Sequence, residues 1–238
     1  MTAQLIVALD VPDTAAMIKA VDRIGDAVSF YKVGLELFIS AGPQCLAPLH
    51  ERGKSIFLDL KLHDIPRTVA NAVRSAAGHN VSLLTVHAGG GAAMLKAASQ
   101  TAAEFPQRPL IVAVTALTSL NDADLQQLGV VRSVAEHARN LGTLAIESGV
   151  DGLVCSANEV ADLRHEFGPQ TVLVTPGIRP AGTAVADQKR VATPAAAVAN
   201  GASYLVVGRP VLEAEDPAAA ARSILNEMRN ACGEESRH

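Results

Sequence analysis

Eight short apolar segments recur along the chain, and alanine-rich, helix-like segments separate them. The apolar segments are rich in β-branched residues, and their length suits a strand better than a buried helix. Strands that are apolar on both faces and alternate with helices are typical of a parallel sheet covered by helices. The eight segments span residues 5–10, 29–34, 56–61, 83–88, 110–117, 152–157, 171–177 and 204–209.

Two architectures contain such a sheet. A doubly wound sheet usually has fewer strands, and a glycine-rich turn follows its first strand. Here the first segment ends in "ALDVPD" (8–13), which contains no glycine. Eight units in 238 residues, with no change of composition that would mark a linker, instead predict an α/β protein with one (β/α)8 TIM barrel. We therefore expect residues 1–238 to form a single domain, with its active site at the C-terminal ends of the strands.

Charge and cysteine spacing argue against several other classes of protein. The net charge is −4 and no block is rich in Lys and Arg, so we do not expect nucleic-acid binding. Cys45, Cys155 and Cys232 lie far apart and lack the paired spacing of metal ligands. The N-terminus "MTAQLIVALDVPD" lacks the basic region of a signal peptide, and no apolar run approaches the roughly 20 residues of a membrane span. We expect a cytoplasmic protein without a membrane segment or a bound metal.

The segment "IFLDLKLHDIP" (56–66) places charges in an otherwise apolar strand. Because strand side chains alternate, Asp59 and Lys61 share one face, and the leucines between and beside them take the other. Asp64 follows just past the strand, and Lys32 ends the neighbouring strand. In a barrel all of these ends meet at the C-terminal face. The charges form either a structural ion-pair network or a catalytic site, and their position at this face favours catalysis.

A phosphate site is expected on the other side of the same face. In TIM barrels, phosphate commonly binds at the loops that follow the seventh and eighth strands. Gly208 allows a close approach of the backbone, and Arg209 offers a bidentate guanidinium. Arg179 follows the seventh strand and is the second candidate. The segment 179–193 has no clear helical or strand pattern, and long loops of this kind are often lids over an active site.

The segment "DLKLHDIPRTV" resembles the signature of the orotidine 5′-monophosphate decarboxylase family, Asp-x-Lys-x-x-Asp-Ile-Pro-x-Thr. Other segments resemble that family in the same order along nearly the whole chain. They are "ALD" at 8–10, "KVGLELF" at 32–38, "VTALTS" at 114–119, "TPGIRPAG" at 175–182 and "VVGRP" at 206–210.

The resemblance implies a carboxy-lyase that converts orotidine 5′-monophosphate to UMP, the last step of de novo pyrimidine nucleotide synthesis, without a metal or an organic cofactor. Lys61 matches the family's proton donor to C6. Lys32, Asp59, Lys61 and Asp64 match its alternating array of charges, in which Asp64 comes from the other subunit of a homodimer.

The resemblance also assigns contacts to the rest of the nucleotide. Asp10 matches a contact to a ribose hydroxyl, and Thr118 matches a contact to the pyrimidine. Gln188, within the long loop, would reach the phosphate and the pyrimidine. Thr68 would join Asp64 as a contact given by the partner subunit.

Two other functions fit parts of this pattern. Metal-dependent decarboxylases and aldolases of sugar phosphates, such as 3-keto-gulonate 6-phosphate decarboxylase, also carry an Asp-x-Lys-x-x-Asp strand but use Mg²⁺. A barrel that only binds nucleotides, as a sensor, is the second alternative. The extension "DIPRT" (64–68) and the loop with Gln188 favour the nucleotide enzyme, and a sensor would leave the internal charges unexplained.

Overall fold

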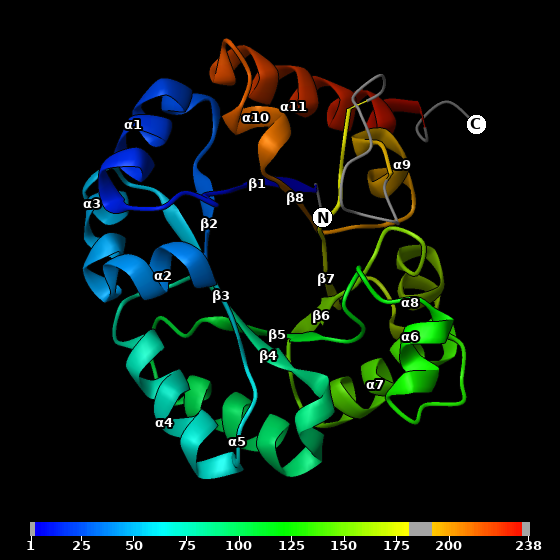
Figure 1. Ribbon diagram of the computed structural model, residues 1–238. Coiled ribbons are helices and arrows are strands. Elements are labelled where there is room, and N and C mark those ends of the chain that lie inside the picture. Colours follow the sequence, from blue (N-terminus) through cyan, green and yellow to red (C-terminus); the bar gives the residue numbers. More distant parts are fainter. Residues whose placement is uncertain (1–2, 181–191, 235–238) are drawn as a thin grey trace.

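The computed structural model describes residues 3–180 and 192–234, in which eight parallel strands form one closed barrel. Each strand pairs with the next along the chain, and the last returns to pair with the first (Figure 1). The predicted (β/α)8 barrel is confirmed. The strands are β1 (Gln4–Ala8), β2 (Phe30–Gly34), β3 (Ser55–Leu62), β4 (Leu83–His87), β5 (Leu110–Val114), β6 (Gly152–Val154), β7 (Val172–Thr175) and β8 (Tyr204–Val207).

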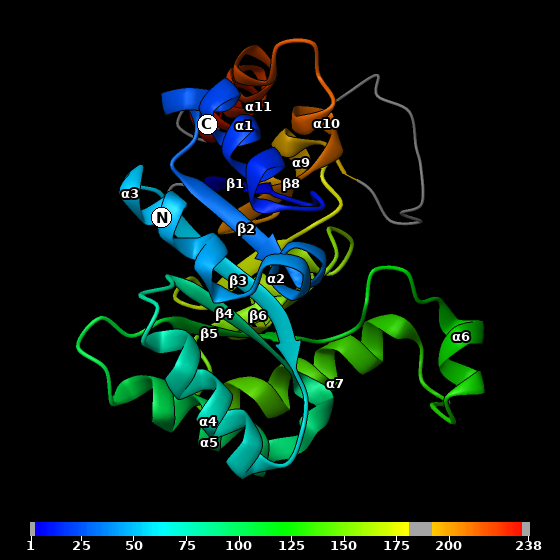
Figure 2. The ribbon, with the colours of Figure 1, turned by 60° about the vertical axis from the view of Figure 1, so that its left-hand side comes forward.

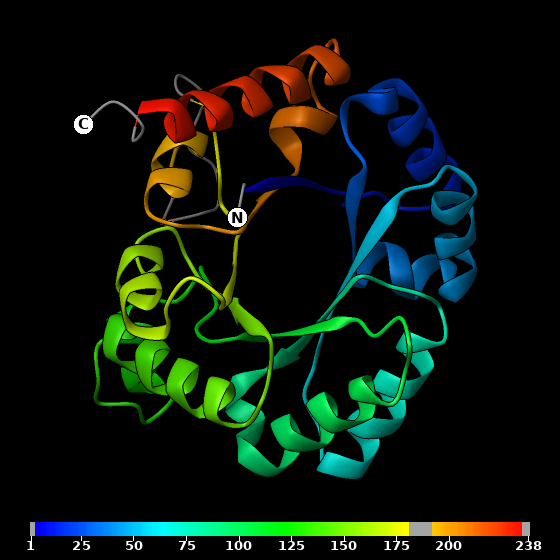
Figure 3. The same ribbon diagram turned by 180° about the vertical axis from the view of Figure 1, so that it is seen from behind.

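Helices form a ring around the outside of the barrel, which is visible from both ends (Figure 1, Figure 3). No helix in the described part of the chain is both long and apolar enough to cross a membrane. The longer helices are α1 (Thr14–Ile24), α4 (Pro66–Ala77), α5 (Gly91–Ala103), α7 (Val134–Glu147), α8 (Val160–Phe167) and α11 (Pro217–Glu234). The shorter ones are α2 (Leu35–Ala41), α3 (Ala47–Glu51), α6 (Asp122–Gln127), α9 (Pro194–Ala199), α10 (Arg209–Leu212) and the 3₁₀ turns η1 (Gly25–Ala27), η2 (Pro43–Leu46) and η3 (Ala88–Gly90).

Local signals in the sequence set where several helices begin. Asp13 caps α1, because its side chain accepts a hydrogen bond from the backbone N–H of Ala16. Ser133 and Glu136 form a capping box at the start of α7. The Asp216-Pro217 step, which is typical of a helix start, does begin α11, and Asp216 accepts from the N–H of Ala219. The helix α6 stands out from the barrel beyond the neighbouring helices (Figure 2).

Alternation along the strands divides the core into two layers. Outward-facing residues pack under the helices in one large cluster. Inward-facing residues fill the barrel itself, and the rings of Phe30 and Tyr204 meet edge to face there, with centroids 5.6 Å apart. The inner layer consists of Ile6, Ala8, Phe30, Phe57, Leu83, Val112, Val172, Val174 and Val206.

Toward the C-terminal ends of the strands, the inward-facing side chains change from apolar to charged. Lys32 follows Phe30 by two residues on β2, and Asp59 follows Phe57 by two residues on β3. Both charged side chains therefore point inward, above the apolar layer. The barrel is closed by packed side chains below, and it is open and polar at its mouth.

Candidate active site

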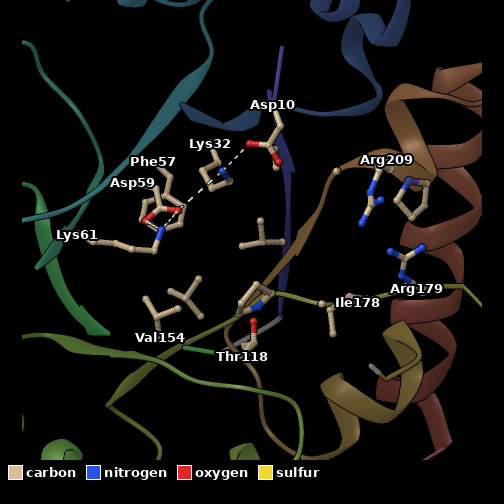
Figure 4. A pocket seen from close by; sticks show the side chains of 17 residues that line it. Asp10, Lys32, Phe57, Asp59, Lys61, Thr118, Val154, Ile178, Arg179 and Arg209 are labelled. Atoms are coloured by element: carbon tan, nitrogen blue, oxygen red, sulfur yellow. Dashed lines mark hydrogen bonds and ion pairs between the residues drawn. The ribbon is translucent and has the colours of Figure 1, made fainter. Parts of the chain in front are cut away.

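A cavity of about 290 Å³ lies at the mouth of the barrel, where the strands end (Figure 4). This is close to the lower end of the volumes typical of small-ligand sites. Its walls come from the ends of β1, β2, β3, β6, β7 and β8 and from the loops that follow β5, β7 and β8. The lining residues are Ala8, Asp10, Lys32, Phe57, Asp59, Lys61, Thr118, Val154, Val174, Pro176, Gly177, Ile178, Arg179, Val206, Gly208, Arg209 and Pro210.

A chain of alternating charges crosses one side of this cavity. Lys32 Nζ lies 2.9 Å from Asp10 Oδ1 and 3.8 Å from Asp59 Oδ2. Lys61 Nζ lies 2.8 Å from both Asp59 oxygens. The side chains of Lys32 and Asp59 are only 12% and 13% exposed. Burial of these charges is tolerated because each has an opposite charge beside it.

Glycine at position 34 leaves room for the ammonium of Lys32. A Cβ at Gly34 would lie 2.9 Å from Lys32 Nζ and 3.5 Å from Asp10 Oδ1. Any side chain there would therefore have to push Lys32 away from its contact with Asp10. Gly34 ends β2 and precedes α2, so the open space is built into the turn itself.

The strand that carries Asp59 and Lys61 is irregular at its C-terminal end. Leu58 pairs with Leu84, but Leu62 pairs with Val86, so β3 contains two more residues than β4 between the same points. Lys61 has φ 51°, a left-handed conformation that is uncommon for a residue other than glycine. Such strain persists only where surrounding contacts hold it, and it tends to occur at functional sites.

Two guanidinium groups face the charged chain from the opposite side of the cavity. Arg179 follows β7 and Arg209 follows β8, and both point toward the same part of the cavity (Figure 4). Gly208 lies directly before Arg209 and also lines the cavity. Thr118, from the loop after β5, lines it as well. The cavity therefore has paired charges at one end and cationic side chains at the other.

The comparison with protein families is decisive. Residues 3–224 match the family model described as "Orotidine 5′-phosphate decarboxylase / HUMPS family". The chain belongs to this family.

Relatives in the orotidine 5′-phosphate decarboxylase / HUMPS family are similar over nearly the full chain. Proteins named orotidine 5′-phosphate decarboxylase from Moorella thermoacetica and Halorhodospira halophila are 49% and 50% identical. The matches cover 94% of this chain in both cases and 92% and 95% of the relatives. The crystal structure of orotidine 5′-phosphate decarboxylase from Lactobacillus acidophilus matches with a TM-score of 0.85 at 38% identity, over 95% of this chain and 99% of that one.

The cavity brings together most of the residues predicted from the family signature, but two of them lie elsewhere. Asp64 and Thr68 are exposed and do not line it. The Asp64 carboxylate accepts a hydrogen bond from the N–H of Ile65, whose side chain is 66% exposed. Gln188 lies outside the described residues. Within residues 3–180 and 192–234, no three His, Cys, Asp or Glu side chains could share a metal ion.

Two histidines stack beside the cavity rather than in it. The rings of His63 and His87 are 5.1 Å apart and nearly parallel, and neither residue lines the cavity. His87 Nδ1 accepts a hydrogen bond from the N–H of Gly89 at the turn into α5. Burial lowers the pKa of His87, and the nearby His63, Lys61 and His137 lower it further. The pair packs against the turn that follows β4.

The residue that sequence reasoning overlooked is Thr85. It lies fully buried inside the barrel, and its hydroxyl contacts both Asp59 and Lys61. The sequence contains a signal for its position, since Thr85 precedes His87 by two residues on β4 and so faces the same way. The apolar walls formed by Phe57 and Val154 were also absent from the predicted set.

Proposed function

We propose that this protein decarboxylates orotidine 5′-monophosphate to UMP, with Lys61 as the proton donor and without a metal or an organic cofactor. The observation that supports it most is the unbroken order Asp10, Lys32, Asp59, Lys61 along one side of the cavity. Arginines stand at the opposite side, as a substrate with a carboxylate at one end and a phosphate at the other requires.

The charge array suits the chemistry of the proposed step. When the bond between C6 and its carboxylate breaks, carbon dioxide leaves and the electron pair stays on C6 as a vinyl carbanion. No adjacent carbonyl can delocalise that charge. An ammonium beside C6 stabilises it and then donates a proton to it, which yields UMP and a neutral Lys61 that regains a proton from solvent.

Pairing with Asp59 keeps the proposed donor in place. Lys61 Nζ contacts both oxygens of Asp59, and an ammonium has three N–H groups, so at least one remains to face the substrate. Lys32 reaches the same carboxylate at 3.8 Å. A donor that is already oriented needs little rearrangement when negative charge develops on C6.

Electrostatic repulsion between Asp59 and the substrate carboxylate is too small to be the main source of catalysis. At about 4 Å and an effective dielectric near 20, two like charges repel by roughly 4 kcal/mol. The two ammoniums beside Asp59 reduce that repulsion further. Very slow reactions need barriers lowered by about 20 kcal/mol. Stabilisation of the carbanion by Lys61 and binding energy from the remote phosphate supply the larger part.

With the substrate carboxylate beside the charged chain and its phosphate beside the arginines, the remaining contacts to the nucleotide can be proposed. Arg209, Arg179 and the backbone of Gly208 would bind the phosphate. Asp10 would accept from a ribose hydroxyl, and Thr118 would bind the pyrimidine. Gln188 would contact the phosphate and the pyrimidine.

A homodimer is part of the proposal, with Asp64 and Thr68 given to the partner's site. It is supported by the exposure of both residues and by their absence from the cavity of their own chain. It is supported also by exposed apolar side chains, since Ile65, directly after Asp64, is 66% exposed and Ile39 of α2 is 77% exposed.

The deciding experiment is incubation with orotidine 5′-monophosphate in the presence of EDTA, while the ultraviolet absorbance of the substrate is followed. We expect full activity and release of one carbon dioxide per UMP. Strict dependence on Mg²⁺ would instead favour a metal-dependent enzyme acting on sugar phosphates. Binding of UMP without release of carbon dioxide would favour a sensor.

A further inference from the structure

Thr85 is a fully buried polar residue that contacts Asp59 and Lys61 of the candidate site but does not line the cavity. It belongs to β4, between Leu84 and Val86, whose partners on β3 are Leu58 and Leu62. Its side chain therefore lies opposite the stretch of β3 that holds both Asp59 and Lys61. A substrate in the cavity would not touch Thr85, so any influence on the reaction has to pass through these two residues.

One hydroxyl makes a different contact with each member of the pair. Thr85 Oγ1 donates to Asp59 Oδ1 at 3.0 Å, and it accepts from the backbone N–H of Lys61 at 2.8 Å. A hydroxyl has a single hydrogen. Because the N–H of Lys61 can only donate, the hydrogen of Thr85 is directed at the carboxylate. The direction of both hydrogen bonds is thereby fixed.

The contact to Lys61 compensates for the irregularity of β3. Between Leu58 and Leu62, β3 has more residues than β4 and departs from regular pairing. The backbone N–H of Lys61 donates to the side chain of Thr85 there. Lys61 is held at φ 51° at the same point. The hydroxyl thus supports the strained backbone from which the ammonium of Lys61 extends.

The second hydrogen bond of Thr85 restrains the carboxylate of Asp59. Asp59 Oδ1 accepts from both Thr85 and Lys61 Nζ, and the side chain is 13% exposed. With one oxygen held by a buried donor, the carboxylate cannot rotate freely away from the ammonium. Thr85 therefore restrains the charged groups at both ends of their contact.

We infer that Thr85 is a positioning residue, whose hydroxyl sets the carboxylate of Asp59 and the backbone of Lys61 so that the ammonium stands ready at the reacting carbon. This inference rests on the proposed decarboxylase function. A displacement of about 1 Å at a reacting group can cost on the order of 100-fold in rate. Loss of the hydroxyl should lower kcat by on the order of 10- to 100-fold, while the phosphate side of the cavity still binds UMP.

Two substitutions separate positioning from packing. Thr85→Val keeps the shape but removes both hydrogen bonds, whereas Thr85→Ser keeps the hydroxyl but removes a methyl group. Positioning predicts that kcat falls strongly in Thr85→Val and recovers in Thr85→Ser. A packing role predicts the reverse order, because valine fills the space better than serine.

The test measures kcat and KM with orotidine 5′-monophosphate, the Kd of UMP and the melting temperature of each variant. Thr171→Val is the matched control, since Thr171 is 8% exposed, lies just before β7 at the end of the barrel opposite the cavity, and donates to the carbonyl of Phe167. It should melt lower to a similar degree but keep its kcat. If Thr85→Val does not fold, Thr85→Cys replaces it, and serine should still exceed cysteine, because a thiol is a weak donor.

The outcomes are distinct. A low kcat in Thr85→Val with nearly unchanged UMP affinity, restored by serine, supports the inference. Wild-type kcat in Thr85→Val, a serine variant slower than the valine variant, or an equal loss in Thr171→Val would overturn it. Wild-type protein that leaves orotidine 5′-monophosphate intact would overturn the proposed function instead, before any variant is compared.

Discussion

Lys61 Nζ contacts both carboxylate oxygens of Asp59, at 2.8 Å each, although the two residues are separated by only one position on β3. The left-handed backbone of Lys61 lies within this short stretch. Two adjacent inward side chains thus form a closed ion pair at the mouth of the barrel. The proposed proton transfer to C6 starts from this ion pair.

Lys61→Ala should lower kcat by at least about 100-fold, since a positioned general acid contributes roughly 10²- to 10⁴-fold. The Kd of UMP, measured by calorimetry, should change little, because the arginine side of the cavity is intact. Lys61→Arg is the matched control: it keeps the positive charge, but a guanidinium does not give up its proton in the accessible pH range. It should also turn over far more slowly than wild type, because it cannot donate the proton to C6 although its charge remains. Substantial turnover in either variant would exclude Lys61 as the proton donor.

Arg209→Ala should raise KM for orotidine 5′-monophosphate by on the order of 10- to 100-fold, as expected for loss of a charge-assisted hydrogen bond of about 1.5–3 kcal/mol. Arg209→Lys keeps the charge without the bidentate geometry and should lie between alanine and wild type. The nucleoside orotidine, which lacks the phosphate, provides the control. Its kcat/KM should be the same with wild type and Arg209→Ala. A parallel loss on both substrates would mean that Arg209 does not act on the phosphate.

Mixing two inactive variants tests whether Asp64 serves the partner's site. Lys61→Ala and Asp64→Ala should each be nearly inactive as homodimers. A mixed dimer with shared sites has one site with both lesions and one with neither. Random exchange makes about half of the dimers mixed, so up to roughly a quarter of all sites should recover in a two-fold dimer. Native mass spectrometry confirms that exchange has occurred. Mixed dimers without recovered activity would refute the shared site.

His87 should make the stability of the protein depend on pH. Folding lowers the pKa of His87, so the unfolded chain takes up its proton at a higher pH than the folded protein. The free energy of unfolding should therefore be undiminished above about pH 6.5, the ordinary histidine value, and should decrease as the pH falls below it. Urea unfolding between pH 5 and pH 8 measures this slope.

His87→Asn removes the titrating ring but retains an acceptor for the N–H of Gly89. The slope of unfolding free energy against pH should become shallower in this variant. Adding His137→Asn, at a second histidine whose pKa burial lowers, should flatten it further. An unchanged slope in both variants would show that other groups cause the acid sensitivity.

The barrel could be predicted because its strands are buried on both faces, which leaves a continuous apolar run in the sequence. The sequence does not show where each of those strands ends. The apolar run 110–117 extends beyond β5, which ends at Val114. Its last residues are apolar because they are buried outside the sheet: Ala116 packs with Leu125 of α6 in a small separate cluster. Apolar composition alone does not distinguish a strand residue from a buried loop residue.

The site was predictable where charge interrupts an apolar strand, as at Asp59 and Lys61. Thr85 gave no such signal, since a β-branched residue is ordinary in a strand. Its importance depends on the shifted register between β3 and β4, which is set by contacts between strands rather than by either segment alone. The strained backbone of Lys61 could not be predicted from the sequence either. Side-chain alternation gives the face on which Lys61 lies, but it does not give its φ angle.

The pairing of β1 with β8 has a consequence for biosynthesis. Gln4 pairs with Tyr204, so β1 is synthesised long before β8, its second neighbour in the barrel, exists. Until then its edge is open, and an open edge is a template for pairing with other chains. The strand that covers it also delivers Arg209 to the cavity. A nascent chain thus loses its aggregation-prone edge and completes its cavity in the same late event.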